Sequence, residues 1–327
     1  AGMYLYFSEL YHVLDQPRFK EAYELAEALV LKLEEDYVDS ISAFYGSFAA
    51  VYPLLYSYRN NHNLKLLAAA ESIAEKYMAG FDSTAITGYD WTGGIASIVK
   101  GFVHLYEETK QERYLAFARQ VLLTIDLAEI KQGGFAHGYA GIIYAANSLL
   151  KLQPDGEVEQ LIKACLVKER TTFDPLQNGW LDLRPIPPQL NDLWCYGATG
   201  IGLAYLDLYT SGFDDERLAT EIQIAAERLL HQEKRDDCLC HGNFGDLAFL
   251  MDYQLSGLAT DEQKEQIYQK IENVAAKIRA GKYTFEGLPT IPKYGLFTGL
   301  AGIGHQILRM AIPEKTADVL TLTLPEK

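Results

Sequence analysis

Residues 138–150 read GYAGIIYAANSLL, a small residue, two variable residues, a second small residue and then an apolar run at helical spacing. The same pattern returns in GSFAAVYPLLYSY at 46–58, GIASIVKGFVHLY at 94–106, GATGIGLAYLDLY at 197–209, GNFGDLAFLMDY at 242–253 and GLAGIGHQILRM at 299–310. The chain opens with GMYLYFSELY from Gly2, which resembles the second half of the pattern and makes seven copies. A recurrence of this kind predicts a fold of repeated supersecondary units.

More polar stretches lie between the copies, with apolar residues at helical spacing and charges on the opposite face. They are residues 21–37, 65–78, 113–126, 157–169, 216–233 and 261–280. The glycine-led stretches are apolar nearly all round, which indicates burial. Each unit is therefore predicted to be an inner helix followed by an outer helix, and seven units favour a closed double ring, an all-α α/α toroid. We expect the paired small residues to let the inner helices approach closely near their N-termini.

The predicted outer layer is one helix short of the inner layer. Seven inner helices are expected but only six outer ones, because the final residues AIPEKTADVLTLTLPEK, 311–327, do not form a helical pattern. We therefore expect residues 1–327 to form a single domain that is a piece of a longer chain, or a ring that residues before Ala1 complete.

Composition excludes several classes of partner. The formal net charge of −15 argues against nucleic acid and against anionic membranes, both of which favour a basic surface. The sequence contains no run of 18 or more apolar residues, so no transmembrane helix is predicted. The first residues, AGMYLYFSEL, lack the features of a signal peptide. We expect a cytoplasmic protein. In that compartment disulfide bonds are not the first role expected for the four cysteines.

The residues with reactive side chains share one position in the repeat. Just before the first glycine of a copy stand Asp90, His137, Cys195, Cys240 and His241. In a ring of parallel inner helices these loops meet at the same end, so the repeat predicts that the five side chains converge. Two thiolates and one imidazole with a fourth position left open are a typical catalytic zinc set. We therefore predict one Zn²⁺ ion bound by Cys195, Cys240 and His241.

Other interpretations exist for each residue taken singly. Cys195 alone is more often a buried small residue, His137 a structural histidine, and Asp90 a residue near a helix N-cap. Cys238 offers a fourth ligand that would close the zinc site, but it lies outside the repeat register. Cys165 lies in a helical pattern and is predicted to be buried. The shared register favours a functional site over these separate explanations.

Five residues flank the reactive positions and are candidates for a substrate groove, with core packing as the alternative. They are Trp91, Tyr139, Trp194, Tyr196 and Asn243.

The motifs together resemble the lanthionine synthetase C-like family. The matching phrases, in the order of that family, are YDWTGGIAS, GGFAHGYAGI, LWCYGATGIG, CLCHGNFG and GLFTGLAGIG. The resemblance covers essentially the whole chain and implies an α/α toroid that cyclises lanthipeptide precursors. It also implies that Cys195, Cys240 and His241 match the zinc ligands of the family, and that His137 and Asp90 match its catalytic histidine and aspartate.

The sequence departs from the family pattern at two places, and both affect which functional residues can be matched to this chain. Ser97 replaces the second glycine in the copy that carries Asp90, although the spacing from Asp90 to Gly94 is kept. The family's cyclases often have an arginine shortly before the Trp-Cys pair, where this chain reads QLNDLWC. No role for an arginine is therefore transferred.

The predicted reaction is Michael addition of a peptide cysteine thiol to dehydroalanine or dehydrobutyrine. The C-terminal tail and the abrupt N-terminus most resemble the cyclase end of a type II lanthipeptide synthetase. The implied partners are a dehydrated precursor peptide and a fused or separate dehydratase. One alternative is the addition of glutathione or another thiol to dehydrated residues in proteins, and a second is a zinc-stabilised scaffold that binds peptides without catalysis. The Cys-Cys-His set argues against prenyl transfer, because toroids with that activity use an Asp-Cys-His set.

Overall fold

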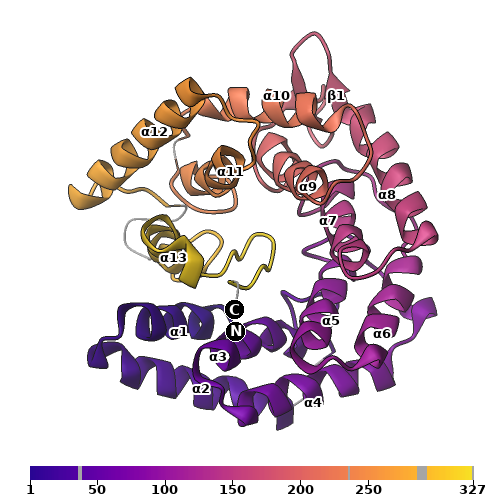
Figure 1. The fold of residues 1–327 in the computed structure, drawn as a ribbon, viewed down its shortest axis with the longest axis vertical. Helices are drawn as coiled ribbons and strands as arrows, with labels where there is room; N and C mark the ends of the chain where they lie inside the picture. Colours follow the sequence, from indigo (N-terminus) through magenta and orange to yellow (C-terminus); the bar gives the residue numbers. More distant parts are fainter. Residues whose placement is uncertain (36–38, 235, 286–292, 326–327) are drawn as a thin grey trace.

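The computed structural model describes residues 1–35, 39–234, 236–285 and 293–325, whose helices alternate between two concentric layers (Figure 1). The inner layer comprises α1 (Gly2–Leu14), α3 (Val51–Asn61), α5 (Ala96–Thr109), α7 (Tyr139–Leu150), α9 (Ala198–Thr210), α11 (Asn243–Leu255) and α13 (Leu300–Ala311). The outer layer comprises α2 (Lys20–Glu35), α4 (Leu64–Gly80), α6 (Glu112–Leu123), α8 (Gly156–Glu169), α10 (Leu218–Leu230) and α12 (Asp261–Arg279). Because α13 packs against both α11 and α1, the first and last inner helices close the ring. The predicted α/α toroid is confirmed.

The predicted helix boundaries differ from the observed ones by a few residues. Four of the inner helices begin directly after the first glycine of their motif, which is the N-cap residue of α7, α9, α11 and α13. Each of the six predicted outer stretches forms a helix, and residues 36 and 37 of the first stretch lie outside the described residues. Local capping fixes some of these starts, as in α12, where Thr260 and Gln263 form a capping box.

The paired glycines have a different role from the predicted one. A Cβ atom on Gly138 would lie 2.2 Å from the carbonyl carbon of Gly133, and one on Gly302 would lie 1.7 Å from the carbonyl oxygen of Leu296. In both cases the nearest atoms belong to the loop that leads into the same helix, not to a neighbouring inner helix. The glycines therefore let each loop fold tightly back over the start of its own helix, and this fixes the loop residues just before the motif.

Ser97 departs from the glycine pattern because it makes a hydrogen bond of its own. Its side-chain oxygen accepts the backbone N–H of Ala43 at 2.9 Å, and the residue is fully buried. The copy that carries Asp90 is thereby tied to the preceding loop.

The C-terminal segment, defined as residues 316–325, is not helical, as predicted. After α13 the chain forms a short 3₁₀ turn, η5 (Pro313–Lys315), and then enters the space enclosed by the inner helices (Figure 1). The Tyr52 hydroxyl donates to the carbonyl oxygens of Asp318 at 3.3 Å and Thr323 at 3.0 Å. His104 Nε2 lies 2.7 Å from the carbonyl oxygen of Leu322. The segment thus fills the axis of the ring, and in the described part of the chain no outer helix follows α13.

A small three-stranded antiparallel sheet interrupts the helical pattern between α8 and α9. Its strands, in the order β1-β2-β3, are β1 (Phe173–Asp174), β2 (Gly179–Asp182) and β3 (Gln189–Leu190). This insertion accounts for the long spacing before Cys195. None of the helices in the described residues is long and apolar enough to cross a membrane.

Candidate functional site

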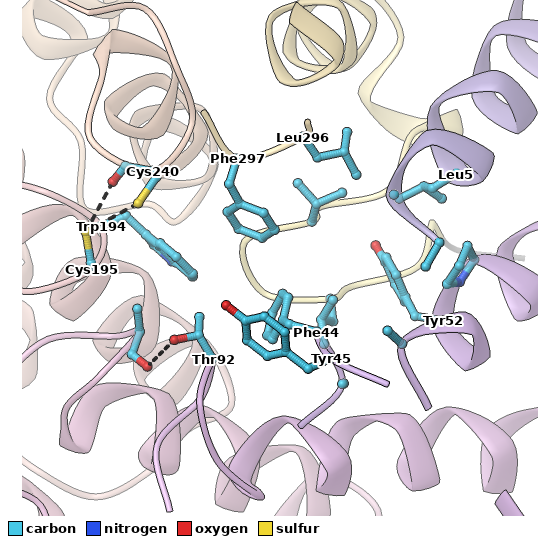
Figure 2. Close-up of a pocket in the computed structure, with 18 of the residues that line it drawn as sticks. Leu5, Phe44, Tyr45, Tyr52, Thr92, Trp194, Cys195, Cys240, Leu296 and Phe297 are labelled. Carbon is cyan, nitrogen blue, oxygen red and sulfur yellow. Dashed lines mark hydrogen bonds between the residues drawn. The ribbon is translucent and has the colours of Figure 1, made fainter. Parts of the chain in front are cut away.

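The loops before α5, α7, α9 and α11 meet at one cavity of about 440 Å³ (Figure 2). Its lining includes Thr92, His137, Cys195, Tyr196 and Cys240. These residues span a long stretch of sequence but occupy equivalent places in their repeats. The convergence follows from the ring, because parallel inner helices present all their leading loops at the same end.

Cys195 and Cys240 form a close pair of cysteines that are not joined in a disulfide. Their sulfur atoms lie 3.4 Å apart, and the Cys195 sulfur is 3.7 Å from the carbonyl oxygen of Cys240. The hydrogen bond with the Cys240 thiol lowers the pKa of Cys195, against the opposing effect of burial. The positive charges of His137 and Arg184 lower this pKa further. The pair is therefore suited to a deprotonated, metal-binding state.

The spacing of the two sulfurs is compatible with a shared zinc ion. Zinc–sulfur bonds of about 2.3 Å in a tetrahedral site place two thiolate sulfurs about 3.8 Å apart. The observed separation of 3.4 Å is within a few tenths of an ångström of that value. Thiolates are also among the preferred ligands of zinc. Two of the three predicted zinc ligands therefore fit the ion.

His241, the third predicted ligand, has a different set of neighbours. Its Nε2 atom lies 3.9 Å from a carboxylate oxygen of Asp236. The ligand atoms of Asp236, Cys238 and His241 lie within 4.8 Å of one another, which makes them an alternative metal-binding group. Cys238 in this group is fully buried, and burial raises its pKa to about 12. The structure thus brings Cys195 and Cys240 together and places the His241 imidazole beside the alternative group.

His137, which lines the same cavity, is paired with Asp90. His137 Nδ1 lies 3.1 Å from Asp90 Oδ2, and the other carboxylate oxygen accepts the backbone N–H of Gly93 at 2.5 Å. Asp90 is thus both a local turn cap and the partner of the histidine. The Thr92 hydroxyl, 3.3 Å from His137 Nδ1, also donates to the carbonyl oxygen of Ala136. These contacts hold the imidazole beside the thiol pair.

Tyr196 connects the histidine to an arginine of the sheet insertion. The rings of His137 and Tyr196 stack with centroids 5.0 Å apart. The Arg184 guanidinium carbon lies 3.5 Å from the Tyr196 ring centroid, and Asp182 pairs with the same guanidinium at 2.6 Å. Arg184 precedes the QLNDLWC stretch in the sequence and reaches the site because the loop after β2 folds back onto it.

A buried carboxyl group on an outer helix holds the loop that carries His137. Glu169, at the end of α8, accepts the backbone N–H of Gly134 and of Ala140, each at 2.9 Å. Burial raises the pKa of Glu169 to about 8. The loop in turn rests on the cysteine loop, since the N–H of Ala136 donates to the carbonyl oxygen of Cys195 at 3.2 Å. Glu169 therefore fixes the loop that carries His137 and that contacts the backbone of Cys195.

The five flanking residues divide into two groups. Trp194 and Tyr196 line the cavity. Trp91 is fully buried and packs edge-on against Phe135 and Tyr144. Tyr139 donates to the carbonyl oxygen of Ile130 at 2.8 Å, and Asn243 donates to the carbonyl oxygen of Lys234 at 3.0 Å. For Trp91, Tyr139 and Asn243 the observed contacts are those of core packing and loop support.

Sequence reasoning missed several residues that line the cavity. Phe44, Tyr45 and Phe297 stand one or two positions before the first glycine of their copies, so the register already contained a signal for them. Their side chains are not reactive, and chemical reactivity was the property that singled out the other residues at these positions. Val319 and Leu322 of the C-terminal segment also line the cavity. No repeat or motif marked them, because that segment has no equivalent elsewhere in the chain.

Comparison with protein families and known proteins gives a consistent result. The family described as "Lanthionine synthetase C-like protein" matches residues 1–324. The lacticin 481/lactococcin biosynthesis protein of Lactococcus lactis subsp. lactis is 26% identical over 200 residues. That alignment covers 57% of this chain and 21% of the relative, so the chain matches about one fifth of the relative's length.

Two solved structures show how widely the fold is used. Nisin cyclase superposes with a TM-score of 0.72 at 16% identity, covering 98% of this chain and 90% of its own. A sugar epimerase from a ruminal bacterium gives a TM-score of 0.53 at 11% identity, covering 89% and 88%. At these identities the similarity concerns the fold alone. Because one toroid supports unrelated chemistry, function has to be argued from the site.

Proposed function

The chain belongs to the lanthionine synthetase C-like family, and from that premise we propose that it closes thioether rings in a dehydrated peptide. A cysteine thiol of the peptide adds to the β-carbon of dehydroalanine or dehydrobutyrine in the same peptide, giving lanthionine or methyllanthionine. A dehydratase, fused or separate, supplies the dehydrated residues. The convergence of Cys195, Cys240 and His137 on one cavity is the observation that carries this proposal.

We assign one zinc ion to Cys195, Cys240 and His241. Bound there, zinc would lower the pKa of a peptide thiol and so supply a thiolate near neutral pH. Both cysteines line the cavity, whereas Asp236, Cys238 and His241 do not. This favours Cys195 and Cys240 as the ligands that face the substrate. His241 belongs to both candidate groups, and the assignment requires its imidazole to turn away from Asp236.

His137 is assigned the transfer of a proton to the peptide. As the carbon–sulfur bond forms, the π electrons of the dehydrated residue move to its α-carbon, which must gain a proton. Asp90 holds Nδ1 of the imidazole, which leaves Nε2 to deliver that proton. The thiol proton is released in the same reaction, so the addition is balanced. Tyr196 keeps the imidazole plane in place by stacking.

The test is to separate turnover from peptide binding in the variant His137→Asn. We expect the rate of ring closure on a dehydrated, cysteine-containing peptide to fall by about 100-fold or more, with the Kd for the peptide nearly unchanged. The asparagine retains a polar side chain of similar reach, which limits structural disturbance. Unchanged turnover would contradict the assignment of His137, and absence of turnover in the wild type would favour a peptide-binding scaffold.

The alternative of external thiol addition is tested in the same assay. Glutathione is offered together with a dehydrated peptide that lacks cysteine, and adducts are identified by their mass. We expect no enzyme-dependent adduct, because the proposed reaction uses a thiol within the peptide. Rapid formation of the glutathione adduct would instead identify the protein as a thiol transferase.

A further inference from the structure

The cavity has a second half that the proposed chemistry does not use. In Figure 2, Cys195 and Cys240 lie at one side, and Leu5 and Tyr52 lie at the other, with Phe297 and Tyr45 between them. We infer that this second half binds a bulky, uncharged apolar side chain next to the reacting cysteine of the peptide, and that the C-terminal segment sets its depth. This inference rests on the proposed function, since it assumes a peptide substrate.

Aromatic residues of the cavity stand at the same position in the repeat as its reactive residues. Residues one or two positions before the first glycines supply both the reactive residues His137, Cys195 and Cys240 and the aromatic residues Phe44, Tyr45 and Phe297. The rings of Phe44 and Phe297 are in edge-on contact, with centroids 5.5 Å apart. An apolar group that enters beside the thiols therefore meets an aromatic wall directly.

The floor of the apolar half is built by the C-terminal segment. Val319 and Leu322 line the cavity from inside the ring, and Leu5 of α1 and Tyr52 of α3 complete this end. The Tyr52 hydroxyl is already bonded to the carbonyl oxygens of Asp318 and Thr323. It therefore has no free hydrogen-bond donor to offer a ligand. The floor is also held firmly, because Ala317 N–H donates to the buried Glu9 carboxylate at 3.0 Å.

The charge of the lining decides which side chains fit. The chain is 22% charged, yet among the described residues no aspartate, glutamate, lysine or arginine side chain lines the cavity. A charged side chain placed in the apolar half would lose its hydration without gaining an aspartate, glutamate, lysine or arginine side chain as a partner, at a large cost in free energy. An apolar side chain gains in proportion to the area it buries. The pocket therefore selects phenylalanine-like side chains over aspartate-like ones.

The inference is tested by binding of peptides that cannot react. We would use acetylated, amidated heptapeptides with one cysteine, with alanine in place of dehydroalanine, and with Phe, Ala or Asp at both positions flanking the cysteine. We expect the Phe peptide to bind about tenfold more tightly than the Ala peptide, and the Asp peptide to bind more weakly than either. Equal Kd values for the three peptides would overturn the inference.

Variants of the C-terminal segment locate the effect. Val319→Phe should fill the pocket and reduce the preference for the Phe peptide to less than about threefold. Leu322→Ala removes part of the floor and should also reduce it, which provides a second variant if Val319→Phe does not fold. Leu320→Ala is the matched control, because Leu320 is fully buried in the same segment but does not line the cavity. A folded Val319→Phe or Leu322→Ala variant with the wild-type preference would overturn the role of the segment.

Failure of this inference is distinguishable from failure of the proposed function. Peptide affinities are measured without any reaction, and ring closure is measured separately on the corresponding dehydrated peptides. Ring closure without a side-chain preference in Kd would refute the pocket and leave the activity intact. A clear preference without ring closure would refute the activity and leave an apolar peptide-binding site.

Discussion

At the scale of single residues, four of the five reactive side chains, all but His241, lie in a network of contacts that joins different repeats. Asp90 comes from the loop before α5 and holds His137 from the loop before α7. That second loop contacts the backbone of Cys195, whose sulfur meets Cys240 from the loop before α11. The site therefore depends on the relative placement of four loops, and a change in one supporting residue is expected to affect several side chains.

The first residue-scale prediction concerns the metal ligands. Purified Cys195→Ser should lose the zinc found in the wild type, about one ion per chain, whereas Cys238→Ser should retain it. The reason is that Cys195 pairs with Cys240 at the cavity, while Cys238 belongs to the alternative group with Asp236 and His241. Elemental analysis of the two variants checks this. Zinc that survives Cys195→Ser and disappears in Cys238→Ser would place the ion in the alternative group.

The second residue-scale prediction concerns Glu169. Burial raises the pKa of its carboxyl to about 8 from an ordinary value of 4.5, so the folded state retains the proton that the unfolded state releases. The stability contributed by the protonated form is complete below about pH 4.5 and is lost as the pH rises through about 8. As the pH rises, the free energy of unfolding of the wild type should therefore fall relative to that of Glu169→Gln, by at most roughly 5 kcal/mol.

Urea unfolding at pH 5 and pH 8.5 measures this difference for the two proteins. Glutamine does not titrate, so a constant cost of its altered hydrogen bonds cancels in the comparison between the two pH values. A difference in stability that is the same at both pH values would contradict the assigned burial of a titrating carboxyl group.

At the scale of elements, the C-terminal segment is held inside the ring by contacts that lie outside the repeat pattern. Arg309 of α13 binds Asp252 of α11 at 2.9 Å and Asp318 of the segment at 3.2 Å. The side chains of Arg309 and Asp318 are each only 9% exposed, so this pair is screened little by water. The arginine thus joins two inner helices and the segment that fills the ring.

We predict that Arg309→Met lowers the free energy of unfolding by about 3–5 kcal/mol, because it leaves the buried Asp318 charge without its partner. Lys163→Met is the matched control, since the Lys163–Glu159 pair is about half exposed, at 48% and 46%. That variant should cost less than about 0.5 kcal/mol. Similar losses for the two variants in thermal or urea unfolding would contradict the structural role assigned to Arg309.

The elements also show where sequence reasoning succeeds and where it stops. Periodicity predicted all thirteen α-helices of the described residues, because each buries one face or all of its surface. It did not predict the path of residues 316–325, since an irregular segment is placed by individual hydrogen bonds such as those from Tyr52. Nor did it predict Arg184 beside Tyr196, because that contact depends on how the sheet insertion folds back.

At the scale of the whole molecule, the ring brings residues that share one position in the repeat together at one site. Residues just before the repeat glycines gather at one end whatever their distance along the chain, which is why Cys195, Cys240, His137 and Asp90 were predicted together. The register could not predict side-chain direction, and His241 shows this by facing Asp236. The same register also placed the aromatic residues Phe44, Tyr45 and Phe297, which chemical reactivity alone gave no reason to select.

The most direct measurement of the central claim is mass spectrometry of a dehydrated, cysteine-containing peptide after incubation with the protein and then with a thiol-alkylating reagent. Ring closure does not change the mass of the peptide but consumes its thiol. The account predicts that the wild-type protein with zinc yields a peptide of unchanged mass that no longer takes up the reagent, and that Cys195→Ser leaves the peptide fully alkylated. Full alkylation after incubation with the zinc-loaded wild type would contradict the proposed cyclase activity.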